Sequence, residues 1–119
     1  MTNVSVNSGI CGYSVLITAL RGKDKKISIS LETECEMVKK MLEDVSTLDI
    51  MAAFTGYLNN PVYRSAAGRL KHVACPVPSA ILKAVEVEIS ACLPKNASIT
   101  FLKQQTPAEQ AAVMKQEGL

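Results

Sequence analysis

The sequence is poor in aromatic residues and contains no tryptophan: Phe and Tyr together make up 4% of its 119 residues. A hydrophobic core must therefore be built mainly from aliphatic side chains. These are plentiful, because 48% of the residues are hydrophobic and only 20% are charged. This composition excludes an intrinsically disordered chain. The length fits one domain, so we interpret residues 1–119 as a single domain.

The chain also lacks an excess of charge of one sign. It has 13 Lys and Arg residues against 11 Asp and Glu residues, which gives a net charge of +2. Nucleic-acid-binding domains usually concentrate basic residues on one face. Here the one basic cluster, residues 21–26, is interrupted by Gly22 and Asp24 and is typical of a solvated turn. The sequence therefore gives no reason to expect a nucleic-acid partner.

No hydrophobic run reaches the roughly 18 residues that a membrane-spanning helix needs. The polar N-terminus, Met1 to Ser8, is also unlike a secretory signal peptide. We therefore expect a cytoplasmic protein with no membrane partner. In that reducing compartment the four cysteines stay reduced. They are then free thiols, metal ligands or redox groups, and not a disulfide framework.

The clearest structural pattern is a β-hairpin followed by a helix. Ile27 to Leu31 alternates apolar residues with serine, as a half-buried strand does. Tyr13 to Leu20 is predicted to be its partner strand, joined to it by the turn at residues 21–26. Thr33 and Glu36 have the spacing of a capping box, which predicts a helix beginning near Thr33.

Three further helices are predicted after residue 46. Residues 47–57 form a second short helix, and Asn60-Pro61 opens the next, because Asn caps helices well and Pro is tolerated at the first position. The last of the three begins near Cys75. The apolar stripe that we expect it to pack against the hairpin consists of Leu82, Val85, Ile89 and Cys92.

Short elements are predicted at both ends of the chain. Val4 to Val6 forms a first strand, Ala97 to Leu102 a last strand, and residues 107–117 a short C-terminal helix after a second capping box. The order of elements indicates an α+β fold, with an antiparallel sheet based on the β-hairpin and packed against several helices.

Three cysteines lie where a thiolate is stabilised. Cys11 is in a glycine-flanked loop, Cys35 is in the first turn of a predicted helix, and Cys75 is at the start of another. The positive end of a helix dipole lowers the pKa of a thiol. The chain contains no C-x-x-C pair, so the short-range zinc-finger and ferredoxin patterns are absent. Inert buried cysteines are the alternative, and we assign Cys92, on its helical stripe, to that class.

His72, the only histidine, precedes Cys75 by three residues. A neutral imidazole is a metal ligand or a base, although an ordinary surface histidine explains the position as well. No phosphate-binding loop, nucleophile elbow or metal-binding His-Glu helix is present in the sequence. The sequence therefore identifies no catalytic residue and leaves open whether the protein is an enzyme.

The order of the cysteines resembles that of the U-type iron–sulfur cluster assembly scaffold, over residues 4–92. In that family a first cysteine lies in a Gly-rich loop before a hairpin, a second opens the next helix and a third starts a late helix. The resemblance implies that Cys11, Cys35 and Cys75 are metal or cluster ligands, with His72 as the candidate fourth. The bound group would be an iron–sulfur cluster or zinc, because thiolates suit both. Cysteine desulfurase and acceptor proteins would be the partners.

If the three cysteines share a metal, they should converge at one end of the domain, where the hairpin loop meets two helix N-termini. Bonds of roughly 2.3 Å to the metal would bring the sulfurs within about 4 Å of each other.

A second resemblance is local. Cys75-Pro76-Val77-Pro78 resembles the Cys-Pro-x-Pro motif of the small sulfur-carrier family of the thiouridine relay, over residues 75–102. It implies a persulfide on Cys75. A third hypothesis is a structural or interaction domain with inert cysteines, and membership in a short uncharacterised prokaryotic family would fit the whole chain. We rank metal or cluster binding first. The sequence leaves open any substrate and whether the chain forms homo-oligomers.

Overall fold

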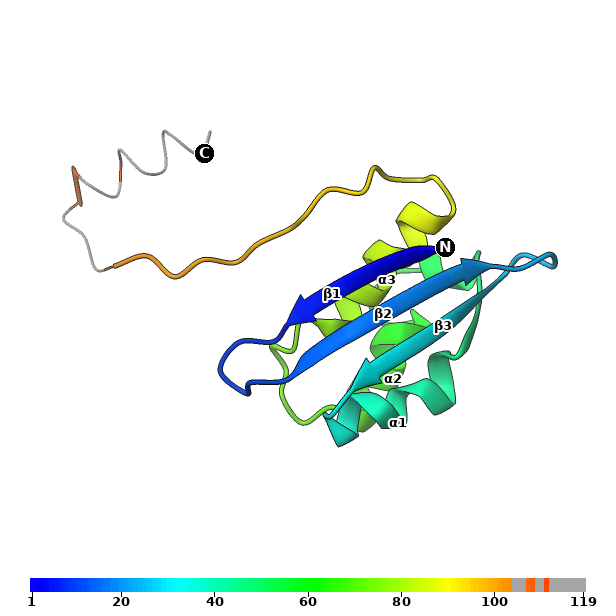
Figure 1. Cartoon of the computed structure of the whole chain (residues 1–119), viewed down its shortest axis with the longest axis horizontal. Helices are drawn as coiled ribbons and strands as arrows, with labels where there is room; N and C mark the ends of the chain where they lie inside the picture. The colour runs from blue at the N-terminus through cyan, green and yellow to red at the C-terminus, as the bar shows by residue number, and fades with distance from the viewer. Residues whose placement is uncertain (104–106, 109–110, 112–119) are drawn as a thin grey trace.

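Four antiparallel strands form one sheet. A computed structural model of the chain describes residues 1–103, 107–108 and 111. The predicted hairpin is confirmed, because the second and third strands pair across the turn at residues 22–25. The strands lie side by side in chain order (Figure 1): β1 (Thr2–Asn7), β2 (Ser14–Arg21), β3 (Lys26–Thr33) and β4 (Thr47–Asp49).

Helices cover one face of this sheet, which confirms the predicted α+β fold. α1 (Glu36–Val45) and α3 (Val77–Glu88) pack directly on the strands, and α2 (Pro61–Arg69) packs against both of these helices. A single 3₁₀ turn, η1 (Ala52–Phe54), precedes α2. In the part of the chain that the structure describes, no helix is long and apolar enough to cross a membrane.

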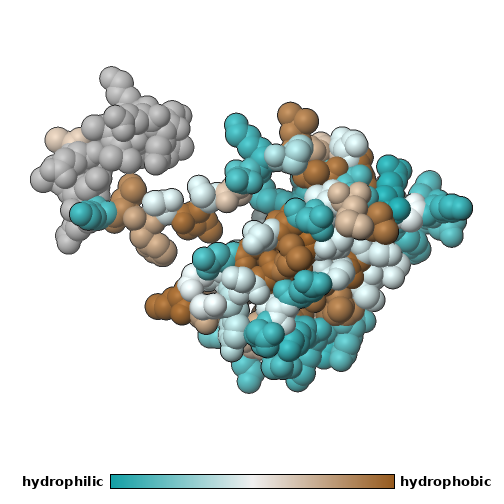
Figure 2. Space-filling view, in the orientation of Figure 1, coloured by the Kyte–Doolittle hydropathy of each residue, from teal (hydrophilic) through white to brown (hydrophobic). Residues whose placement is uncertain are grey.

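The period of two along each strand decides which face meets the helices. Val15, Ile17 and Ala19 of β2 are buried under the helices, whereas the serines of β3 point to the other, open face. The strands lie in front of the helices in Figure 1, so Figure 2 shows this open face, where pale and hydrophilic residues surround a few hydrophobic ones.

α3 buries a different stripe from the predicted one. Val85 is fully buried, but Leu82 and Ile89 are only partly buried. The stripe is shifted because the helix begins at Val77 and lies along both β1 and β2, where small side chains allow a close approach. Its buried residues are Val77, Pro78, Ala80, Ile81, Ala84 and Val85.

Two helix predictions need correction. α1 begins at Glu36, not near Thr33, because Thr33 ends β3 and its Oγ1 accepts a hydrogen bond of 3.1 Å from the N–H of Cys35. The helix predicted over residues 47–57 is wrong: β4 pairs with β3, opposing Leu48 to Ile27, and only the short η1 follows. Burial of Leu48 against β3 overrides the local helical pattern.

The end of α3 is also earlier than predicted. The helix ends at Glu88, and Ser90 then adopts the left-handed conformation with φ of 64°. Cys92 is therefore exposed, and the prediction that it is a buried core residue is wrong. Its thiol donates a hydrogen bond of 3.0 Å to Oε2 of Glu86, and this bond raises the pKa of Cys92.

Residues 93–103 run away from the body of the domain as an extended, exposed segment (Figure 1). The strand predicted at Ala97 to Leu102 does not form, because these residues pair with none of the four strands. The helix predicted at residues 107–117 falls mostly outside the described residues.

Candidate functional site

Cys11 and Cys35 lie at the same end of the sheet because of its register. Asn7 of β1 pairs with Ser14 of β2, so the loop that carries Cys11, residues 8–13, closes this end of the hairpin. Val15, the next residue of β2, pairs with Thr33 at the end of β3. Cys35 follows Thr33 by two residues and is therefore at that end too.

Cys75 reaches this end through the orientation of α3. The last residue of α3, Glu88, accepts hydrogen bonds from Oγ1 of Thr2 at 2.7 Å and from the N–H of Arg21 at 2.9 Å, at the opposite end of the sheet. A helix of 12 residues spans about 18 Å. The N-terminus of α3, which follows Cys75 by two residues, thus lies at the end of the sheet where the β1–β2 loop is (Figure 1). We call this region the cysteine end.

Each of the three thiols has a different environment. Cys11 is exposed, Cys75 is partly buried, and Cys35 is buried at the N-cap position of α1. The Cys11 loop turns at Gly9 and Gly12, whose φ angles of 84° and 77° are strained for any other residue. The domain therefore offers two thiols held by the core and one on an exposed loop.

The pKa of Cys75 is raised, against the expectation from the sequence. Burial is the largest cause, while a hydrogen bond from the N–H of Val77 to the thiol sulfur acts in the opposite direction. Coulomb repulsion between the Cys75 thiolate and the sulfurs of Cys35 and Cys11 raises the pKa of Cys75 further. Because Coulomb energies fall with distance, this influence is consistent with three thiols that lie in one neighbourhood.

The fourth candidate ligand, His72, is exposed in the turn before α3. Its backbone carbonyl accepts a hydrogen bond of 3.3 Å from the N–H of Cys75. Among the described residues, no three His, Cys, Asp or Glu side chains are grouped closely enough to hold a metal ion. A role for Cys11, Cys35, Cys75 and His72 as ligands therefore stays a prediction.

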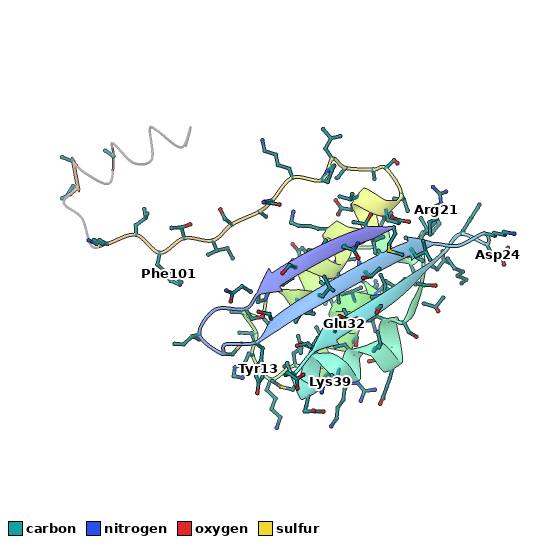
Figure 3. The ribbon with its side chains drawn as sticks, in the orientation of Figure 1. Tyr13, Arg21, Asp24, Glu32, Lys39 and Phe101 are labelled. Atoms are coloured by element: carbon teal, nitrogen blue, oxygen red, sulfur yellow. The ribbon has the colours of Figure 1, made fainter. Side chains whose placement is uncertain are left out.

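Exposed apolar side chains also gather at the cysteine end, and sequence reasoning did not find them. Ile10 and Val73 are fully exposed, and Tyr13, labelled in Figure 3, is 43% exposed. Ile10 is next to Cys11 in its loop, and Val73 is two residues before Cys75. The sequence indicated this apolar surface only through one large apolar residue in the loop before Cys11 and one in the loop before Cys75.

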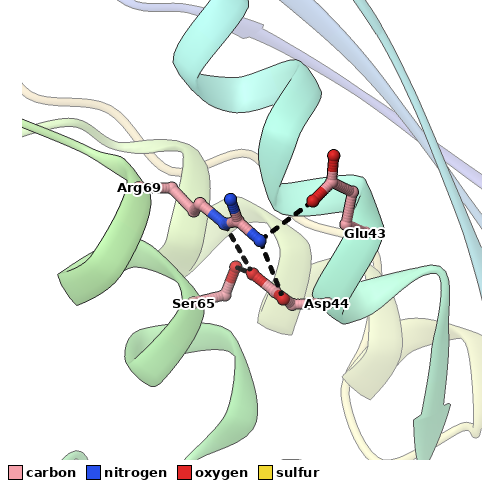
Figure 4. A network of polar contacts seen from close by, with 4 residues as sticks. All are labelled: Glu43, Asp44, Ser65 and Arg69. Carbon is pink, nitrogen blue, oxygen red and sulfur yellow. Dashed lines mark hydrogen bonds and ion pairs between the residues drawn. The ribbon is translucent and has the colours of Figure 1, made fainter.

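α1 holds Cys35 in place, and a polar network fixes α1 to α2 (Figure 4). Arg69 donates to Oδ2 of Asp44 at 3.1 Å and to Oε2 of Glu43 at 3.0 Å. Ser65 donates to the same oxygen of Asp44 at 2.7 Å. The hydrogen bond from Arg69, and to a smaller extent that from Ser65, hold the pKa of Asp44 below its usual range. We assign this network a structural role.

The chain belongs to a family of unknown function, DUF6951, whose shared region matches residues 2–101. This confirms the expectation of an uncharacterised family. No curated protein and no solved structure matches the chain. The resemblances to the cluster scaffold and to the sulfur carrier are therefore not supported by a relative.

Proposed function

We propose that the cysteine end binds zinc or an iron–sulfur cluster through Cys11, Cys35 and Cys75, with His72 as a fourth ligand. The observation that supports this proposal is that three cysteines from separate chain segments lie towards the same end of a small domain. Their order along the chain, which resembles that of the cluster scaffold, gives additional support. Cysteine desulfurase and acceptor proteins are the partners that such a role would require.

Binding would require the Cys11 loop to close over the other two thiols. Cys35 and Cys75 are held by the hydrophobic core, so they form the fixed half of the site. Cys11 is exposed on a loop that leaves and re-enters the sheet within a few residues. The movement is therefore local, and it leaves the fold of the sheet unchanged.

The raised pKa of Cys75 implies that metal binding depends on pH. A metal binds the thiolate, so binding must release the proton that the raised pKa of Cys75 retains. Metal affinity should therefore increase as the pH rises towards the pKa of this thiol. The partly buried position that raises the pKa also shields the bound group from water.

The test is metal analysis of the full chain purified without oxygen, combined with its absorption spectrum and an assay for acid-labile sulfide. We expect zinc without sulfide, or iron with sulfide. Cys11→Ser and Cys75→Ser should each weaken binding by more than about tenfold. Cys92→Ser is the matched control, because Cys92 is an exposed thiol beyond the end of α3. Absence of metal, or equal losses in all three variants, would overturn the proposal.

Sulfur transfer is a second candidate, favoured by the position of Cys75 before the start of α3. The backbone N–H of Val77 there acts to lower the pKa of Cys75, and a persulfide anion would be stabilised in the same way. Incubation with a cysteine desulfurase and cysteine should then add the mass of one sulfur atom to the chain. Cys75→Ser would prevent that addition, whereas Cys11→Ser would not, and this difference separates sulfur transfer from shared metal binding.

A further inference from the structure

The extended segment at residues 97–102, which we call the arm, has the pattern of a β-strand without a partner. Ile99 and Phe101 alternate with Ser98 and Thr100, which is the period of a strand with one apolar face. Ile99 is 87% exposed and Phe101 is 97% exposed. Figure 2 shows hydrophobic side chains along this segment, and Figure 3 labels Phe101 far from the sheet.

β1 offers an edge that such a strand can join. It pairs with β2 on one side, and no described strand pairs with it on the other. A groove of about 660 Å³ runs along this free edge from Thr2 to Asn7. Ala80 and Val87 of α3 contribute apolar side chains to the groove. Unpaired backbone groups beside an apolar groove favour the addition of a strand.

Only the first half of the chain's own arm reaches this groove. Residues 94–99 are among the residues that line it, whereas Phe101 and Leu102 are not. The family's shared region extends to Phe101, so the exposed arm is part of the common domain. An extended apolar segment that belongs to the domain but turns away from its own body is typical of an exchanged segment.

We propose that two copies of this chain exchange arms, and that the arm of the second copy occupies the groove along β1. Figure 1 shows the arm and β1 running in the same direction. Neighbouring copies of one strand about a two-fold axis run antiparallel. The partner's arm would thus lie antiparallel both to this chain's arm and to β1.

The exchange produces one continuous sheet across the dimer. From one protomer to the other the order is β1, the partner's arm, the chain's own arm and the partner's β1. With the period of two, Ile99 and Phe101 of each arm face the α3 side of the groove. Ser98 and Thr100 then extend the open face, which already carries Ser5 of β1 and the serines of β3. The inference is independent of the cysteines.

The first test is the molar mass of the full chain by light scattering after size exclusion. We expect a mass of about twice the 12.8 kDa of one chain. The double variant Ile99→Asp with Phe101→Asp should halve that mass, because it places charge on the buried side of the arm. Leu58→Asp is the matched control: Leu58 is 91% exposed but lies elsewhere, and its substitution should leave the dimer intact.

Hydrogen exchange of the backbone amides separates an exchanged arm from other arrangements. In the dimer, the amides of residues 97–102 should be protected, and the double variant should lose this protection together with the dimer. A monomer with protected arm amides would show that the arm folds onto its own β1 and would overturn the proposal. A monomer with an unprotected arm, or a dimer that survives the double substitution, would overturn it as well.

Discussion

A substitution at Asn60 tests how η1 is attached to the start of α2. The side chain of Asn60 is buried, with 2% exposed, and makes three hydrogen bonds. Oδ1 accepts from the N–H of Val62 at 3.0 Å, which caps α2. Nδ2 donates to the carbonyl oxygens of Ala53 at 2.9 Å and of Thr55 at 3.2 Å, which fixes η1 against the start of α2.

Asn60→Ala removes all three bonds. Loss of the cap costs about 1 kcal/mol of unfolding free energy. The carbonyl of buried Ala53 is left without this donor, which costs about 1–3 kcal/mol more, whereas exposed Thr55 can turn to water. The total is about 2–4 kcal/mol. At roughly 4 °C per kcal/mol the melting temperature should fall by about 8–16 °C.

Urea unfolding followed by circular dichroism measures this loss. Asn60→Ser retains an acceptor for the cap but is too short to reach Ala53, so it should recover about 1 kcal/mol. Asn59→Ala is the control, since Asn59 is exposed, and its effect should stay within about 0.5 kcal/mol. If Asn60→Ala and Asn59→Ala unfolded at the same urea concentration, the three bonds would not contribute as argued.

Two further predictions concern a carboxylate and a glycine. Because the pKa of Asp44 is lowered in the folded state, its contribution to stability is present above the ordinary pKa of an Asp and is lost as the pH falls through the folded value. Asp44→Asn should therefore have a lower free energy of unfolding than the wild type at neutral pH, but not in acid. An equal difference in unfolding free energy at both pH values would show that the Asp44 carboxylate does not stabilise the fold through this network. Gly12→Ala should lower the unfolding free energy by about 1 kcal/mol, because φ of 77° is strained for alanine. Gly56→Ala is its control: an added Cβ meets nothing there either, but the backbone is not in the left-handed region, so a loss as large as that of Gly12→Ala would rule out backbone strain as the cause.

The parts of the fold that were predicted correctly are those that depend on neighbouring residues in the sequence. The hairpin follows from the alternation at Ile27 to Leu31 and a polar turn, and α2 begins where Asn60-Pro61 indicates. β4 was missed because its three residues gain their stability from pairing with β3, a contact that the residues themselves do not encode.

The end of α3 shows why a boundary can be hidden in a sequence. Pro94 was the expected stop, but the N–H groups of Ala91 and Cys92 bond back to the carbonyl of Glu86, at 2.8 Å and 3.3 Å. This reversal needs a left-handed residue, which is usually glycine and is Ser90 here. Because no glycine marks this turn, the predicted helix ran on to Cys92. The exposed thiol of Cys92 was therefore wrongly predicted to lie in the core.

The cysteine end was predictable in position but not in chemistry. Cys11, Cys35 and Cys75 were each assigned to the start of an element, and an antiparallel register then places two such starts at one end of the sheet. The pKa of Cys75 depends on burial, however, and burial follows from how α3 lies across β1 and β2. The dipole at a helix N-terminus led to the prediction that the pKa of Cys75 is lowered. Desolvation by the packed core raises this pKa by more than the helix end lowers it. A thiol that stays protonated until a ligand displaces its proton suits metal binding with proton release better than it suits an unassisted nucleophile. This is the physical reason for ranking metal binding above sulfur transfer at Cys75.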